Sequence, residues 1–197
     1  MDEIKSAFEI AMERAERLGS ASAEEQTRWR LEPEGERLAA AHLQEEANLV
    51  PALTRYPPHD RPYVVAGAQK VFLHTLGLPR SGVVKRRNRR AMEALKAIKE
   101  DKVAVENVFT KMRRLFEHYE AQGEQQRQQA HRDLREDFQA QLQRAMTQQG
   151  ARPAFGSTLQ PENHPQFQEE WRRVLAQLDA QYLKVLEEYR AELTEIR

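Results

Sequence analysis

The chain has 197 residues, of which 31 % are charged, 40 % hydrophobic and 7 % aromatic, and its formal net charge at pH 7 is zero. Long tracts of Glu, Gln, Arg, Ala and Leu suit helices that each bury one stripe, so we do not expect a large multilayer core. The lack of cysteine excludes disulfides, thiolate catalysis and cysteine-bound zinc, and it fits a reducing cytoplasm.

Neither a secretory signal nor a membrane span is predicted. Residues 1–19 carry acids within an amphipathic pattern and lack a basic start followed by an apolar run. The most apolar stretch, residues 63–78, contains Gln69, Lys70 and His74 and is shorter than the roughly 20 apolar residues that cross a bilayer. We therefore expect a soluble, cytoplasmic protein that makes no membrane contact.

Residues 1–79 are expected to form a small N-terminal helical region. Apolar residues spaced by three and four predict a helix over residues 4–18 that stops at Gly19. Ser22 and Glu25 fit a capping box for a second helix, which Pro33 interrupts or restarts and which continues towards Pro51.

A loop and a third helix complete this region. Residues 51–62 contain four prolines, which cannot continue a helix because proline lacks the amide donor. Asp60 and Pro62 then look like the start of a helix that stops at residues 77–79. Its apolar stripe consists of Val65, Ala68, Phe72 and Leu76.

Residues 80–197 are expected to form an extended arm. A heptad-like seam lasts five repeats and predicts one long helix packed against a partner helix. The seam consists of Val84, Asn88, Ala91, Leu95, Ile98, Lys102, Val105, Phe109, Met112, Phe116 and Tyr119. It weakens in the Gln-rich residues 120–131 and resumes in a shifted phase at Leu134, Phe138, Leu142 and Ala145.

A turn-forming run near residues 150–165 separates this helix from a last one that begins at Pro165. Two long stripes joined by a loop predict an antiparallel helical hairpin, coiled-coil-like, either self-paired or completed by a second copy of the chain. The expected fold is therefore all-α. The last stripe consists of Phe167, Trp171, Leu175, Leu178, Tyr182, Val185, Tyr189, Leu193 and Ile196.

The sequence KRRNRR, residues 85–90, places five cations in six residues. Residues 80–102 contain 9 bases and 3 acids, whereas residues 1–50 contain 12 acids and 6 bases. Cations at the start of a helix are unfavourable with respect to the helix dipole, and a bound anion reverses that effect. We therefore predict an anion or nucleic-acid site formed by Arg80, Lys85, Arg86, Arg87, Arg89, Arg90 and Lys96.

Three sources of the anion remain open for this basic segment. Nucleic acid, the acidic surface of a partner and the chain's own acidic N-terminal half all supply the required charge. The alternative to an anion site is a solvated helix face without a binding role, because the five cations of KRRNRR fall outside the seam. No zinc finger or RNA-recognition motif accompanies the basic run.

We predict no enzyme activity, no cofactor, no metal site and no catalytic residue. No Glu-x-x-His pair, phosphate-binding P-loop or Gly-x-Ser-x-Gly elbow occurs in the sequence. His118, between Glu117 and Glu120, is interpreted as a surface histidine, and His59 with Asp60 as a turn and helix cap. The aromatic residues at helical spacing are interpreted as packing.

The opening residues 1–19, MDEIKSAFEIAMERAERLG, resemble the starts of small, uncharacterised, helix-rich bacterial proteins of unknown function. The resemblance implies a bacterial cytoplasmic origin and assigns no chemistry. The expected function is a non-enzymatic interaction or assembly module that acts through exposed helix faces, with a protein partner or by self-association. The alternative is a nucleic-acid or ribosome-associated factor that uses residues 80–90.

Overall fold

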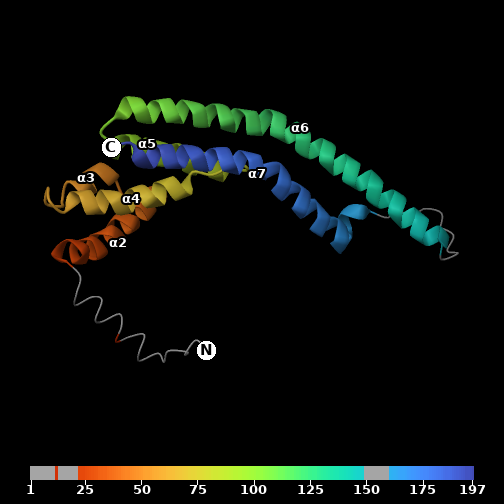
Figure 1. The fold of residues 1–197 in the computed structure, drawn as a ribbon, viewed down its shortest axis with the longest axis horizontal. Helices are drawn as coiled ribbons and strands as arrows, with labels where there is room; N and C mark the ends of the chain where they lie inside the picture. Colours follow the sequence, from red (N-terminus) through yellow and green to blue (C-terminus); the bar gives the residue numbers. More distant parts are fainter. Residues whose placement is uncertain (1–11, 13–21, 149–159) are drawn as a thin grey trace. The chain divides into compact units, whose positions relative to one another are not determined.

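The computed structural model describes residues 12, 22–148 and 160–197 of the protein. Its regular elements in these ranges are all helical and include no strand, which confirms the predicted all-α fold. The helix predicted over residues 4–18 and most of the loop predicted over residues 150–165 lie outside the described residues. The elements, labelled in Figure 1, are α2 (Ala23–Leu43), α3 (Leu49–Leu53), α4 (Arg61–Thr75), α5 (Gly82–Ile98), α6 (Lys102–Gln148), the 3-10 helix η1 (Pro161–Asn163) and α7 (Pro165–Glu195).

Contacts within the chain divide it into two compact units. The first unit comprises the chain up to Leu76 together with Arg86–Lys102, and the second comprises Gly77–Lys85 and Val103–Arg197. The predicted division of the chain into residues 1–79 and 80–197 stays a prediction. No helix in the described ranges is both long enough and apolar enough to cross a bilayer.

Helix α2 begins where the capping box was predicted. The Ser22 hydroxyl accepts a hydrogen bond from the Glu25 amide at 3.2 Å, and the Glu25 carboxylate accepts one from the Ser22 amide at 2.8 Å. These two bonds satisfy two of the amide donors that a helix leaves open at its start. Pro33 lies inside α2 and neither interrupts nor restarts it.

The end of α2 corrects the sequence prediction, because the helix stops at Leu43 and does not continue towards Pro51. Glu45 adopts the left-handed conformation, with φ of 69°, and thereby turns the chain away from the helix axis. The short helix α3 then occupies the start of the predicted proline loop. Pro51 is tolerated there because it lies in the first turn, where an amide needs no partner within the helix.

Helices α2 and α4 pack directly against each other in the first unit (Figure 1). A Cβ atom placed on Gly35 would stand 1.9 Å from the carbonyl oxygen of Val64, and one on Gly67 would stand 2.0 Å from that of Glu32. Both distances are too short for any side chain, so the two backbones touch at this crossing. Around it lie the buried side chains of Leu31, Ala39, Ala68 and Phe72.

An ion pair beside the crossing also links these two helices. One carboxylate oxygen of Glu32 accepts a hydrogen bond from Lys70 Nζ on α4 at 2.6 Å, and the other accepts one from Arg28 Nε at 2.6 Å. The hydrogen bond from Lys70 lowers the pKa of Glu32, burial opposes that shift, and Arg28 adds to it. Glu32 is therefore held as a carboxylate between two cations.

The long helix predicted along the heptad-like seam is wrong in one respect, because the chain leaves the helix between Ile98 and Lys102. The seam is divided between α5 and α6. Asp101 stands immediately before the first residue of α6, a position where aspartate is favoured because its side chain competes for backbone amides. Seam residues on both sides of the break are buried, including Asn88, Leu95, Val105 and Phe109.

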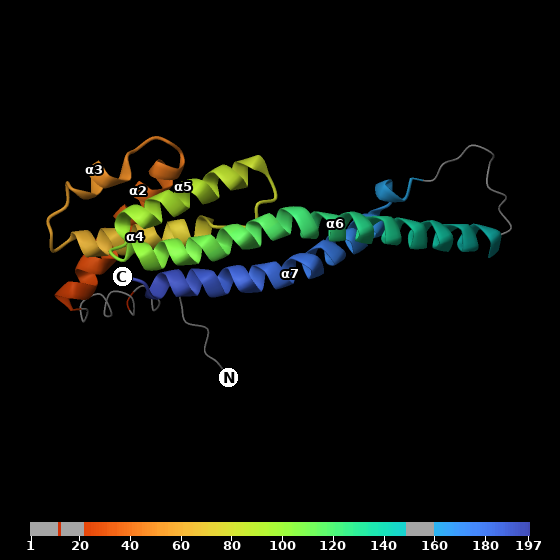
Figure 2. The ribbon, with the colours of Figure 1, turned by 90° about the horizontal axis from the view of Figure 1, so that it is seen from above.

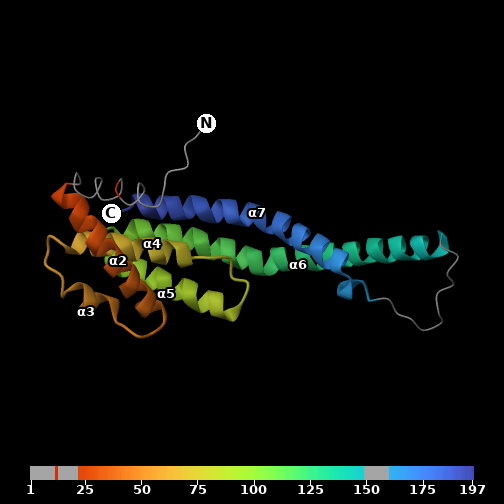
Figure 3. The same ribbon diagram turned by 90° about the horizontal axis from the view of Figure 1, so that it is seen from below.

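Helices α6 and α7 run side by side in the second unit in all three views (Figures 1, 2 and 3). Their contacts follow opposite directions along the chain, so the pairing is antiparallel. From one end to the other, Lys111 contacts Glu192, Tyr119 contacts Tyr182, His131 contacts Phe167, and Phe138 contacts His164. The predicted stripes supply the buried Phe109, Met112, Phe167 and Leu193, whereas Leu186, which is also buried, lies outside the predicted stripe.

We expect Gly35→Ala and Gly67→Ala each to destabilise the first unit by about 2 kcal/mol or more, because the new methyl group collides with backbone and no side chain can move aside. Gly123→Ala on α6 is the matched control, since its Cβ would meet mainly the ends of flexible side chains at 3.1 and 3.3 Å. Its gain in helix propensity should keep the change within about 1 kcal/mol. Denaturant unfolding measures all three, and equal effects would contradict the backbone contact.

The Glu32 ion pair predicts a specific loss of stability in acid. Because the pKa of folded Glu32 lies below its ordinary value of 4.5, its contribution is present above that value and is lost as pH falls through the lowered pKa. Glu32→Gln should therefore be less stable than the natural chain at neutral pH and should lose less stability on acidification. Denaturation midpoints from about pH 7 to about pH 3 test this. Glu36→Gln, at an exposed position on α2, should follow the natural chain.

Candidate functional site

Two of the predicted anion-binding residues belong to the second unit, and both pair with its own acids. Arg80 donates a hydrogen bond from Nη2 to Asp179 Oδ2 on α7 at 2.5 Å. Lys85 Nζ lies 2.8 Å from Glu120 Oε1 on α6. The two side chains are 58 % and 52 % exposed, respectively, so each still reaches solvent. Both acids come from the chain itself but from outside its acidic N-terminal half, so they differ from the three sources considered from the sequence.

Asp179 makes the Arg80 pair different from an ordinary surface ion pair, because the residue is only 5 % exposed. The Tyr119 hydroxyl, buried on α6, lies within hydrogen-bonding reach of both Arg80 and Asp179. Within the described part of the chain, the other carboxylate oxygen, Oδ1, has no hydrogen-bond partner. A buried carboxylate of this kind depends strongly on the partners that it does have.

The pKa shifts reflect the same cluster. Burial raises the pKa of the Tyr119 hydroxyl and the Asp179 carboxylate adds to the effect, whereas Arg80 and Arg127 oppose it. Burial alone would lower the pKa of the Arg80 guanidinium, but its hydrogen bond to Tyr119 and the charge of Asp179 raise it overall. At neutral pH the cluster therefore consists of a protonated phenol and an ion pair. This ion pair joins the chain segment before α5 to α7.

The other predicted residues belong to the first unit and do not share one partner. Arg90 forms an ion pair with Glu45, and Arg89 Nε bonds to Glu93 Oε1 on the next turn of α5 at 3.0 Å. Lys96 is exposed. Arg86 and Arg87 are exposed and take part in no side-chain hydrogen bond or ion pair among the described residues. Within each unit, the cations whose partners are given above contact separate acids, and the predicted anion site stays a prediction.

Glu45 was not singled out from the sequence, although it belongs to the acidic N-terminal half. Glu45 pairs with Arg90, and among the described residues it is the one residue other than glycine that has a positive φ. That conformation costs a residue with a Cβ atom about 1–2 kcal/mol, and glycine is its usual occupant. For Arg90, the contact corresponds to one of the three sources considered for the anion, the chain's own acidic half.

The histidines discussed above have partners that explain them structurally. His118 Nδ1 lies 3.0 Å from the Tyr182 hydroxyl on α7, and His59 Nε2 lies 3.5 Å from Asp60. Among the described residues, no group of three or more His, Asp or Glu side chains is placed to hold a metal ion.

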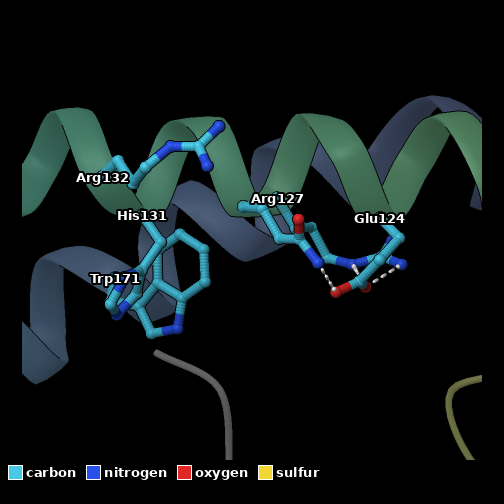
Figure 4. Close-up of a pocket in the computed structure, with 6 residues that line it drawn as sticks. Glu124, Arg127, His131, Arg132 and Trp171 are labelled. Carbon is cyan, nitrogen blue, oxygen red and sulfur yellow. Dashed lines mark hydrogen bonds and ion pairs between the residues drawn. The ribbon is translucent and has the colours of Figure 1, made fainter.

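A cleft in the second unit brings together residues that the sequence prediction did not group. It has a volume of about 440 Å³ and is formed by one face of α6 together with one side chain of α7. In Figure 4 the rings of His131 and Trp171 lie at one end and the Glu124–Arg127 pair at the other. The spacing of three and four along α6 is the signal in the sequence that places these residues on one face. The lining residues are Glu124, Arg127, Gln128, His131, Arg132 and Trp171.

Because Asp179 is buried, Arg80→Ala should destabilise the protein by about 1–2 kcal/mol, a figure reduced from that of a fully buried pair by the exposure of Arg80. Arg86→Ala removes the same side chain from an exposed position that has no ion pair among the described residues, and it should change stability by less than about 0.5 kcal/mol. Denaturant unfolding of both variants tests whether Arg80 is a structural cation. Similar changes in the two would contradict that assignment.

The chain was also compared with known proteins. Residues 50–195 match the model of a family of unknown function, DUF6657. Among curated proteins and among solved structures, nothing matches the chain. The match confirms the expected relationship to uncharacterised proteins, although it covers the helices from α3 onwards and not residues 1–19, on which that expectation was based. Since the match spans most of its length, the chain belongs to DUF6657, a family of unknown function.

Proposed function

We propose that this protein is a non-enzymatic interaction module that contacts a partner protein through exposed helix faces, and that Arg86 and Arg87 on α5 form part of one contact surface. The observation that carries this proposal is the difference between these two arginines and their neighbours. Arg80, Lys85, Arg89 and Arg90 all have carboxylate partners within the protein, whereas Arg86 and Arg87 have none among the described residues.

The chemistry of this surface favours an acidic partner. Arginine has a planar guanidinium that binds carboxylates through two parallel hydrogen bonds, and it is enriched among residues that dominate interface energies. Two consecutive guanidinium groups on a rigid helix present these donors with little loss of backbone freedom. A partner helix or loop rich in Asp and Glu matches them, and so does an acidic face of a second copy of this chain.

Binding to nucleic acid is the second candidate, and the adjacency of Arg86 and Arg87 favours it as well. This function needs more phosphate contacts than two arginines make, so paired cations such as Lys85 and Arg89 would have to leave their acids. Exposed ion pairs stabilise proteins by about 0–1 kcal/mol, so Lys85 and Arg89 could exchange their carboxylate partners for phosphates with little loss of stability. Arg80 is the exception because its partner is buried.

The proposal is tested with two charge-reversed variants of the tagged protein in its native host. The first is Arg86→Glu with Arg87→Glu. The second, the matched control, is Arg30→Glu with Arg37→Glu, at exposed positions of α2 that form no ion pair among the described residues. A partner protein should co-purify with the natural chain and the control and be lost from the first variant. Purified components should then reproduce that difference in a binding titration, while light scattering reports self-association.

Salt dependence separates the two candidate functions. With labelled duplex DNA, the logarithm of the binding constant falls with the logarithm of salt concentration with a slope of about −0.9 for each phosphate contact. Two arginines give a slope of about −2, whereas the five cations of KRRNRR give about −4.5. A steep slope that the first variant abolishes would replace the protein-interaction proposal by the nucleic-acid one. If a partner binds the first variant and the natural chain equally, α5 takes part in neither of the two candidate functions.

A further inference from the structure

The cleft in the second unit has chemistry that the proposed α5 surface does not use. We infer that it binds a small ligand in which a flat aromatic ring carries an anionic group, as in an aromatic carboxylate or a nucleoside monophosphate. Its volume of about 440 Å³ lies within the range of roughly 300–1,000 Å³ that is usual for small-molecule sites. This inference goes beyond the proposed function and does not depend on it.

Trp171 provides the surface for the ring. The His131 ring lies 4.9 Å from the Trp171 ring and nearly perpendicular to it, at 84°, and it also packs edge-on against Phe167 at 5.6 Å. Phe167 is only 2 % exposed, so these contacts tie the indole to the core between α6 and α7. Trp171 itself is half-buried and lines the cleft (Figure 4). An indole held in this way is a stacking surface that needs little ordering when a ligand binds.

The charges around the cleft favour an anion. Arg127 bonds to the Glu124 carboxylate through both Nε and Nη2, at 3.1 and 2.9 Å, and its guanidinium lies 4.3 Å from the centre of the Tyr119 ring. Its charge is therefore matched by Glu124. Arg132 donates to the neutral amide oxygen of Gln129 at 2.7 Å and forms no ion pair among the described residues. Two arginines against one glutamate leave one positive charge, which Arg132 carries.

The Trp171 ring and the Arg132 guanidinium line the same cleft, so we expect a ligand that contains both a ring and an anionic group. Arg132 directly follows His131 on α6, and in Figure 4 its side chain extends above the rings of His131 and Trp171. A ring stacked on the indole can therefore carry its negative group towards the Arg132 guanidinium. Neither a neutral ring nor a free anion uses both features. If Trp171 only completes the packing of α6 against α7, none of these compounds should bind.

The experiment uses the full chain with Trp29→Phe, which leaves Trp171 as the single tryptophan, since the protein contains two. Its fluorescence is titrated with adenosine monophosphate and with benzoate as the two charged-ring probes. Adenosine, benzamide and inorganic phosphate are the matched compounds that lack either charge or ring. At least one charged-ring probe should change the emission saturably and bind at least about tenfold more tightly than its uncharged counterpart and than phosphate. The tighter of the two identifies the source of the anionic group.

Variants connect that binding to the cleft. Arg132→Gln should weaken the charged-ring probe about tenfold and leave the uncharged ring unaffected, because only the ion pair is lost. Arg144→Gln, at an exposed position further along α6 and outside the cleft, should bind as the natural chain does. Circular dichroism verifies that both variants stay helical. The inference is overturned if no probe gives a saturable response at millimolar concentration, if phosphate binds as well as the charged rings, or if both variants behave alike.

Discussion

The second unit depends on how it accommodates a carboxylate that is almost wholly removed from water. An ionised group in that position costs several kcal/mol unless it is paired and hydrogen-bonded. Asp179 on α7 forms an ion pair with Arg80 and has the Tyr119 hydroxyl of α6 within reach. The segment that precedes α5 is therefore joined to both α6 and α7 at one cluster. Arg80 is therefore occupied inside the protein, even though it stands at the edge of the most basic stretch of the sequence.

Other cations of KRRNRR also have acid partners within the protein, but these acids are exposed and not buried. Lys85, Arg89 and Arg90 each contact a different acid, and those acids come from α6, from α5 itself and from the turn after α2. Most of the segment's charge is compensated locally. Arg86 and Arg87 form no ion pair among the described residues, and the proposed contact with an acidic partner is based on these two arginines.

The two proposed binding surfaces differ in their chemistry. In the first unit the helices meet through backbone contact at glycines, and the exposed arginines stand on a helix that is polar outside. In the second unit aromatic rings pack between α6 and α7, and one of them, Trp171, lines a cleft with Arg132, which forms no ion pair among the described residues. Charge alone characterises the first surface, whereas the cleft combines a flat apolar ring with charge. This difference allows the two proposals to be tested separately.

The all-α fold, the capping box of Ser22 and most of the apolar residues buried along α6 and α7 could be predicted from the sequence, because these features follow from spacing along one helix. The sequence did not predict the break at residues 99–101, since the apolar spacing continues across it. Nor did it identify Asp179, Glu45 or the contact between Gly35 and Gly67. An acid beside a stripe looks the same whether it faces water or an arginine 99 positions away, and a helical glycine shows no partner. Those contacts are seen in the three-dimensional structure alone, because burial and charge compensation depend on which helices come together.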